Sequence, residues 1–303
     1  MRGKRLIVGA PIPSARAHHE RFSRTTGLAV LSSDPLSSVA YATEEILRVL
    51  TIGGVAALSL VTPIGAVIAT MLAIVVFSYR QTIFAYPNGG GAYIVAKENI
   101  GRSASLIAAA ALLIDYVLTV AVSVAAGVAA ITSAAPRWSL DPVPVSLVFV
   151  VILMLGNLRG IRESGRLFAA PTYVFIAAIL TMIAVGAWRV FYSGITPAPM
   201  PHDALPLGTG GIGALGIFTI LTAFSNGCTA MTGVEAVSNG VPAFHPPESR
   251  NASATLVMMA VTSIAMFAGI TLLAHAYGIV PSETETVVSQ IARATFGGGT
   301  ALY

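Results

Sequence analysis

The chain of 303 residues is 55% hydrophobic and only 10% charged, and its mean hydropathy of +0.80 excludes a soluble domain of ordinary composition. Its net charge of +4 does not indicate nucleic-acid binding, because basic residues of membrane proteins gather in cytoplasmic loops. A single cysteine, Cys228, permits no intrachain disulfide. We therefore expect a polytopic membrane protein that is embedded in a lipid bilayer.

The first apolar span, residues 26–50, is interrupted in its middle by the polar segment SSDPLSS at residues 32–38. A continuous spanning helix should avoid such a segment, because unpaired polar groups are costly in hydrocarbon. Pro35 lacks an N–H and disfavours helical geometry in the residues before it. We therefore predict a first helix in two halves, about 23–32 and 37–50, with unwound backbone between them.

Further apolar runs predict six more helices that are long enough to span a bilayer. The sixth helix of the chain contains a second interruption, SNGCTAMTG at residues 225–233. The glycine-rich segment 86–93 predicts a re-entrant or packed loop, and residues 283–301 predict the start of an eighth helix. The six further helices are predicted at 54–79, 103–134, 143–158, 167–191, 211–241 and 252–279.

Interrupted helices near the bilayer midplane are where transporters place substrates and ions. Here the first and sixth helices are interrupted, and a separation of five helices is typical of an inverted five-helix repeat. Two unrelated kinks in an ordinary bundle are the alternative, because Gly and Pro are frequent in membrane helices. The favoured division is a cytoplasmic tail at 1–24, a first repeat at 25–192, an extracellular loop at 193–211 and an incomplete second repeat at 212–303.

The distribution of Lys and Arg indicates the orientation of the chain in the membrane. If the N-terminus is cytoplasmic and the helices alternate, 13 of the 17 basic residues fall on the inner side and 4 on the outer side. The outer residues are Arg48, Arg137, Arg189 and Arg293. We therefore predict a multi-pass protein of the cell membrane with a cytoplasmic N-terminus.

Three carboxylates lie in the predicted membrane interior: Asp34, Asp115 and Glu235. Such acids are costly to bury unless they are protonated or paired with a cation, so each is a candidate site residue. Hydroxyl-bearing residues share a helix face with each acid, because they follow the helical spacing of three or four. These residues are Ser38 and Tyr41 for the first acid, Thr119 and Ser123 with the adjacent Tyr116 for the second, and Thr229 and Thr232 for the third.

A structural role is the alternative for these polar residues. Ser and Thr in membrane helices often bond back to the carbonyl four residues earlier, and a buried tyrosine seeks a hydrogen-bond partner wherever it lies. The sequence contains no P-loop, HExxH motif, nucleophile elbow or multi-cysteine metal motif. We therefore expect neither an enzyme nor a bound cofactor, and no nucleic-acid partner.

Three segments resemble the amino acid–polyamine–organocation (APC) superfamily and, within it, the KimA-type potassium–proton symporters. They are SSDPLSSVAYATEEIL at 32–47, YPNGGGAYIVAKENIG at 86–101 and MTGVEAVSNGVPAF at 231–244. The resemblance implies an all-α polytopic membrane protein with a LeuT-like inverted-repeat fold. It also implies import of potassium together with protons, and it is compatible with a homodimer.

The resemblance further implies a potassium site at the unwound parts of the first and sixth helices, next to the third. By position, its ligands are Asp34, Tyr41, Asp115, Tyr116, Thr119, Thr232 and Glu235. For proton coupling we expect Asp115, because desolvation at mid-membrane depth favours protonation of a carboxyl group, and Glu235, because it lies just past the second interruption. The spacing from Asp34 to Tyr41 is also similar to that in KUP-type potassium uptake proteins. An inner gating loop is expected at Gly89, Gly90 and Gly91, where a Cβ would restrict the backbone.

Two features depart from the family pattern. Pro35 stands where the family has a small residue, and the family fold needs more helices than the seven predicted here, so we expect a fragment of a longer protein. An APC-type amino acid permease is the competing function. Such carriers usually offer free N–H groups to the substrate carboxylate at the first break, and Asp34 would repel that carboxylate. A non-transporting scaffold is a third alternative.

Overall fold

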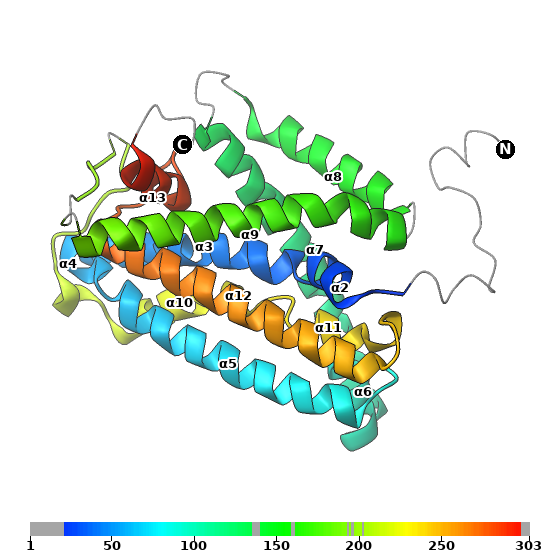
Figure 1. Cartoon of the computed structure of the whole chain (residues 1–303). Coiled ribbons are helices and arrows are strands. Elements are labelled where there is room, and N and C mark those ends of the chain that lie inside the picture. Colours follow the sequence, from blue (N-terminus) through cyan, green and yellow to red (C-terminus); the bar gives the residue numbers. More distant parts are fainter. Residues whose placement is uncertain are drawn as a thin grey trace.

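The computed structural model describes residues 21–134, 140–158, 161–192, 194, 197–201 and 203–297, and these are almost entirely helical (Figure 1). Within them, strand-like pairing is limited to the isolated bridges Phe22–Phe244 and Ala204–Ser282. The predicted all-α fold is therefore confirmed for this part of the chain. Most of the predicted N-terminal tail lies outside the described residues.

Five segments are long and apolar enough to cross a membrane: Val55–Ala85, Arg102–Ala134, Ala169–Tyr192, Ile217–Asn239 and Glu248–Ala276. A sixth apolar helix, α8, is shorter. The α-helices are α2 (Arg24–Leu31), α3 (Ser33–Leu50), α4 (Val55–Leu58), α5 (Val61–Ala85), α6 (Ala92–Asn99), α7 (Arg102–Ala134), α8 (Pro142–Leu158), α9 (Ile161–Tyr192), α10 (Ile217–Gly227), α11 (Ala236–Asn239), α12 (Glu248–Ala276) and α13 (Val287–Phe296).

The first helix is interrupted at a single residue. Ser32 separates α2 from α3, and its backbone still bridges the two, because Ser32 N donates to Leu28 O and Leu36 N donates to Ser32 O, both at 3.0 Å. Unwound backbone up to residue 36 was the wrong prediction, since Asp34 and Pro35 belong to the first turn of α3. Proline is tolerated there because the N–H groups of a first turn have no partner within the helix.

The second interruption is longer and lies close to its predicted place. α10 ends at Gly227 and is followed by a 3-10 turn, η5 (Cys228–Met231). Thr232 is then extended, with φ −64° and ψ 153°, and Gly233 has φ 72° before α11 begins. A Cβ on Gly227 would lie 2.6 Å from side-chain atoms of Ile46, so glycine allows α10 to end directly against α3.

The predicted glycine-rich loop at 86–93 is short and packs against α11, because Gly90 N donates to Ser238 O at 3.1 Å. Tyr86 ends α5, and α6 begins already at Ala92. α6 is a helix that apolar periodicity did not predict, because it is short and only weakly amphipathic.

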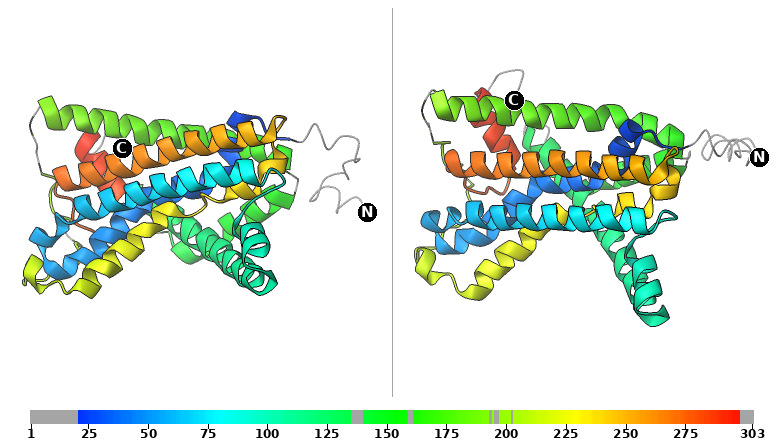
Figure 2. Two further views of the ribbon diagram at one scale, coloured as in Figure 1. Left: turned by 90° about the horizontal axis from the view of Figure 1, so that it is seen from below. Right: turned by 60° about the horizontal axis from the view of Figure 1, so that its bottom comes forward.

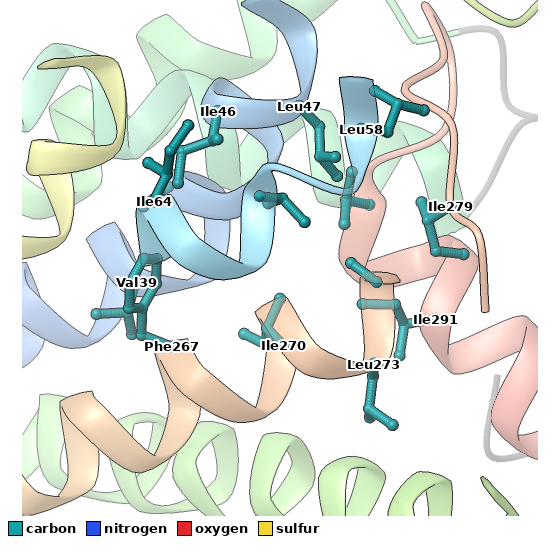
Figure 3. Close-up of a cluster of buried hydrophobic side chains, with 14 of the residues drawn as sticks. Val39, Ile46, Leu47, Leu58, Ile64, Phe267, Ile270, Leu273, Ile279 and Ile291 are labelled. Atoms are coloured by element: carbon teal, nitrogen blue, oxygen red, sulfur yellow. The ribbon is translucent and has the colours of Figure 1, made fainter. Parts of the chain in front are cut away.

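Two buried apolar clusters pack other elements against α5 and α12, and the first contains residues of α3 whereas the second contains residues of α2 and α11. One lies toward the predicted outer end and includes Ile46, Ile64 and Phe267 (Figure 3). The other lies toward the inner end and includes Leu72 and Leu256. Within a bilayer such packing stabilises through van der Waals contact, because lipid tails are as apolar as the side chains. Both interrupted helices are thereby held against long continuous neighbours.

The long helix α7 is packed far less tightly than α5 and α12. Of its 33 residues only Ser105, Val128 and Ser133 are buried, and Figure 2 shows α6 and the beginning of α7 projecting from the rest of the bundle. α8 has no buried residue. The helix that carries three of the predicted ligands is therefore attached to the core mainly through its second half.

Candidate functional site

The carboxylate of Asp34 lies where the two interruptions meet. Its Oδ1 accepts hydrogen bonds from Thr232 Oγ1 at 3.2 Å and from Ser38 Oγ at 3.4 Å. Ser38 Oγ also lies 2.7 Å from Thr232 Oγ1 and 3.1 Å from the hydroxyl of Tyr41. These four residues form the Asp34 cluster, in which a half-buried acid is surrounded by hydroxyl oxygens that can also act as cation ligands.

Gly233 sets the close approach between the second interruption and α3. Its φ of 72° is in the left-handed region that disfavours other residues. A Cβ at this position would lie 2.7 Å from Cδ of Pro35 and would overlap the Asp34 carboxylate. Glycine is therefore required here both by the backbone conformation and by the space beside the acid.

Glu235 is the centre of a second polar group, which we call the Glu235 cluster. Its Oε2 accepts from the Tyr79 hydroxyl at 2.9 Å. Its Oε1 accepts from the Tyr116 hydroxyl at 3.3 Å and from Asn239 Nδ2 at 3.2 Å. Asn239 Nδ2 also lies 3.2 Å from the Tyr116 hydroxyl. Helices α5, α7 and α11 thus all supply donors to one carboxylate.

The seven predicted ligands do not form one shell. Asp34, Tyr41 and Thr232 belong to the Asp34 cluster, whereas Tyr116 and Glu235 belong to the Glu235 cluster. The two remaining residues lie on α7, where Thr119 lines a cavity beside Asp34. Asp115 forms no hydrogen bond within the described residues, and it lies on α7 one residue before Tyr116.

A cavity of about 590 Å³ opens beside the Asp34 cluster, between α3, α7, α8 and α9. Its polar lining consists of Ser33, Asp34, Ser37, Tyr116, Thr119, Ser123, Asn157 and Thr172. The rest of the lining is apolar. This is the combination expected of a small-ligand site, in which a few polar groups converge in a largely apolar cavity.

A second cavity of about 400 Å³ lies toward the predicted outer end, and we call it the outer vestibule. It contains Tyr41, Glu45 and Arg48, and Ser37 and Ser123 line both this vestibule and the first cavity. The oxygens of the two serines are 3.2 Å apart. A single contact between two hydroxyl groups of α3 and α7 therefore lies where the two cavities adjoin.

Glu44 fixes the outer end of α3 to α13. This acid is 8% exposed, and it pairs with Arg48 at 2.9 Å. Its Oε2 accepts from Val287 N, at the start of α13, at 3.0 Å. A carboxylate at a helix N-terminus is stabilised by the free N–H groups there, so Glu44 has a structural explanation.

The predicted gating loop contacts α11 directly. Gly90 N donates to Ser238 O at 3.1 Å, and Ser238 Oγ donates to Gly90 O at 3.0 Å. A Cβ on Gly91 would overlap the side-chain amide of Asn239. Because Asn239 also donates to Glu235, the side chain of Asn239 alone links the glycine loop to the Glu235 carboxylate.

The chain on the predicted outer side is tied down by Asp203. Its Oδ2 accepts from Ser282 Oγ and from Thr284 N, both at 2.9 Å, and from Thr284 Oγ1 at 2.5 Å. These hydrogen bonds, first the one from the Thr284 side chain, lower the pKa of Asp203 below its ordinary value of 3.8. The linker between the two predicted repeats is thereby attached to the segment before α13.

Comparison with known proteins identifies the family. A family model described as Amino acid permease matches residues 22–302. The chain belongs to this family, which is part of the APC superfamily. It is also 47% identical over 300 residues to the potassium transporter KimA of Bacillus subtilis (strain 168), and the match covers 99% of this chain and 49% of that relative. The chain thus spans about half the length of the curated relative that it matches.

Membership of the family confirms the resemblance that was read from the three segments. It does not account for the residues that sequence reasoning missed, which are Tyr79 and Asn239 around Glu235, and Gly233 beside Asp34. Helical spacing contained a signal for one of them, because Asn239 follows Glu235 by four residues. The roles of Tyr79 and Gly233 follow only from contacts between elements that are distant in the sequence.

Proposed function

We propose that this chain carries the cation-binding part of a secondary active transporter that imports potassium coupled to protons. The observation that supports it best is the position of Asp34, whose carboxylate lies at the meeting point of the two helix interruptions among three hydroxyl groups. The name of the Bacillus relative, a potassium transporter, supports the same substrate. The predicted repeats at 25–192 and 212–303, a cytoplasmic N-terminus and a cell-membrane location belong to this proposal.

An amino acid is the competing substrate, and the first interruption favours a cation. Pro35 has no N–H, and Asp34 places a negative charge beside the place where an amino acid's carboxylate would bind. A carboxylate together with hydroxyl groups makes an oxygen-rich environment suited to a hard cation.

For proton coupling we propose Glu235 and Asp115. Both oxygens of Glu235 lie within hydrogen-bonding distance of donors, which come from α5, α7 and α11. Protonation of Glu235 would turn one carboxylate oxygen into an O–H group. One of the three groups that now donate to Glu235 would then lose its acceptor. Tyr116 is both a donor to Glu235 and a wall of the Asp34 cavity, so the protonation of Glu235 and the occupancy of the cavity would be linked through this residue.

The test is growth of a potassium-uptake-deficient strain that expresses the full-length protein. We expect Asp34→Asn and Glu235→Gln to abolish growth at low potassium while the protein still inserts in the membrane. Glu98→Gln is the matched control, because Glu98 is an exposed acid on α6 and its loss should leave growth unchanged. Normal growth of both site variants would contradict the proposal. Uptake of an amino acid panel would distinguish the permease, and crosslinking in membranes would test the expected homodimer.

A further inference from the structure

Two arginines share a groove at the predicted cytoplasmic ends of α5 and α12. These helices run antiparallel, so that the end of α5 meets the beginning of α12 at the lower right of Figure 1. The groove has a volume of about 510 Å³ and is lined by Arg80, Phe84, Arg250, Ser253, Ala254 and Val257. It lies outside both polar clusters and outside the cavity beside Asp34.

The charge of this groove is uncompensated. Both Arg80 and Arg250 are exposed, and in the described part of the chain neither forms an ion pair or a side-chain hydrogen bond. No acid lines the groove. Glu248, two residues before Arg250, already pairs with Arg21 at 2.6 Å. Two guanidinium groups therefore point to an anionic ligand, and their planar forks suit a phosphate group.

An exposed apolar surface continues from the two arginines toward the middle of the membrane. On α5, Phe77 precedes Arg80 by three residues and is 60% exposed. On α12, Val257 and Val261 follow Arg250 by seven and eleven residues and are 40% and 64% exposed. These spacings keep each set on one helix face. The surface thus presents cations at the predicted membrane boundary and hydrocarbon below them.

We propose that this groove binds an anionic phospholipid of the cytoplasmic leaflet. The phosphate would accept hydrogen bonds from Arg80 and Arg250, while an acyl chain would lie along Phe77, Val257 and Val261. Charge complementarity and the position of the arginines at the bilayer surface select this occupant, because basic pockets between helices on the cytoplasmic side suit anionic head groups. The inference does not depend on what the protein transports.

The experiment uses the full-length protein in nanodiscs of phosphatidylcholine that contain spin-labelled phosphatidylglycerol or spin-labelled phosphatidylcholine as the probe. The immobilised fraction of each probe gives its relative association with the protein surface. We expect the wild-type protein to associate with phosphatidylglycerol in preference to phosphatidylcholine. In the double variant Arg80→Gln with Arg250→Gln this preference should be lost, and the relative association should fall by about fivefold for each arginine removed. Lys97→Gln with Arg102→Gln is the matched control, because it removes two charges from the same predicted side outside the groove.

An equal loss of preference in the control pair, or no loss in the groove pair, would overturn the proposal. Displacement of labelled phosphatidylglycerol by millimolar glycerol phosphate would also overturn it, since the groove would then be a site for soluble phosphates. Should the double variant fail to fold, Arg80→Gln and Arg250→Gln are measured singly, and each should show part of the loss.

Discussion

The contact between Gly233 and Asp34 leaves no room for a side chain at residue 233. A left-handed conformation at a residue with a Cβ costs about 1–2 kcal/mol, and here the Cβ would also displace the carboxylate. A side chain at residue 233 would therefore lower stability through the strained backbone and lower function by displacing the Asp34 carboxylate.

We expect Gly233→Ala to lower the free energy of unfolding by about 1–2 kcal/mol and to reduce potassium uptake by more than this destabilisation explains. Thermal unfolding and uptake in proteoliposomes, both on the full-length protein, measure the two effects. Gly213→Ala is the control, because an added Cβ meets no atom within 4 Å there. Unchanged uptake in Gly233→Ala would mean that the position of the Asp34 carboxylate is not critical.

Sequence reasoning succeeded for residues whose relation is local. Ser38 and Tyr41 share a face with Asp34 because helical periodicity acts over one or two turns, and in the structure Ser38 lies within hydrogen-bonding distance of both Asp34 and Tyr41. Tyr79 donates to Glu235 across 156 positions of the chain. No local pattern encodes such a contact, because it depends on how α5 packs against the second interruption.

At the level of elements, the glycine loop and α11 meet through backbone and leave no space for a Cβ. Gly91 has an ordinary φ of −73°, so its intolerance comes from the overlap with Asn239 alone. This separates it from Gly89, whose φ of 104° already requires glycine.

We expect Gly91→Ala to reduce uptake about tenfold or more, as a 1.4 kcal/mol disturbance would, and the combination with Asn239→Ala to restore part of it. The second substitution removes the amide that the Cβ would overlap. Uptake by the wild type, the two single variants and the double variant gives a double-mutant cycle, which isolates the interaction between residues 91 and 239. If Asn239→Ala gives no rescue, the loop does not act through Asn239.

The extent of each interruption could be predicted only in part. Pro35 indicated a break correctly, but its effect on the backbone was overestimated, since a proline in the first turn of a helix removes no hydrogen bond. The second interruption lacks a proline and still extends from residue 228 to residue 235. Its length depends on packing against α3 and on Gly233, neither of which is a propensity of the segment.

The outer linker should respond to acid through Asp203. Because the pKa of this acid is lowered in the folded protein, its contribution to stability is complete above the ordinary value of 3.8 and is lost as the pH falls through the lower folded-state pKa. We therefore expect Asp203→Asn to unfold at a lower temperature than wild type at pH 7, and this difference to disappear at strongly acidic pH. A parallel measurement of Glu98→Gln, on α6, should show no such convergence. A constant difference at all pH values would exclude the charge of Asp203 as its origin.

For the whole molecule, the Asp34 cluster joins parts that lie far apart in the chain, since Thr232 and Asp34 are 198 positions apart. A cation held there would bridge the two predicted repeats. Binding to the folded state alone raises stability by about 2.7 kcal/mol when the free ligand is at 100 times its dissociation constant.

Potassium chloride is therefore expected to raise the unfolding temperature of the full-length protein above its value in choline chloride of equal ionic strength. Asp34→Asn should remove this difference, whereas Glu98→Gln should retain it. This measurement needs no transport, so it separates binding from translocation. The same stabilisation by both salts would argue against a potassium site in this cluster.

The contact between Ser37 and Ser123 has a consequence for how fast an ion could reach the cavity beside Asp34 from each side of the membrane. Where the outer vestibule adjoins the cavity beside Asp34, the rotatable hydroxyls of these two serines lie 3.2 Å apart, and Gly127 also lines both cavities. Rotation of a side chain takes picoseconds to nanoseconds, whereas loops and helices move in nanoseconds to milliseconds. The glycine loop and α11, in contrast, can separate only if backbone segments move. In the proposed transport cycle, and with the predicted orientation, an ion arriving from outside would reach the cavity beside Asp34 faster than the glycine loop and α11 can separate, so the slow step would lie on the predicted cytoplasmic side.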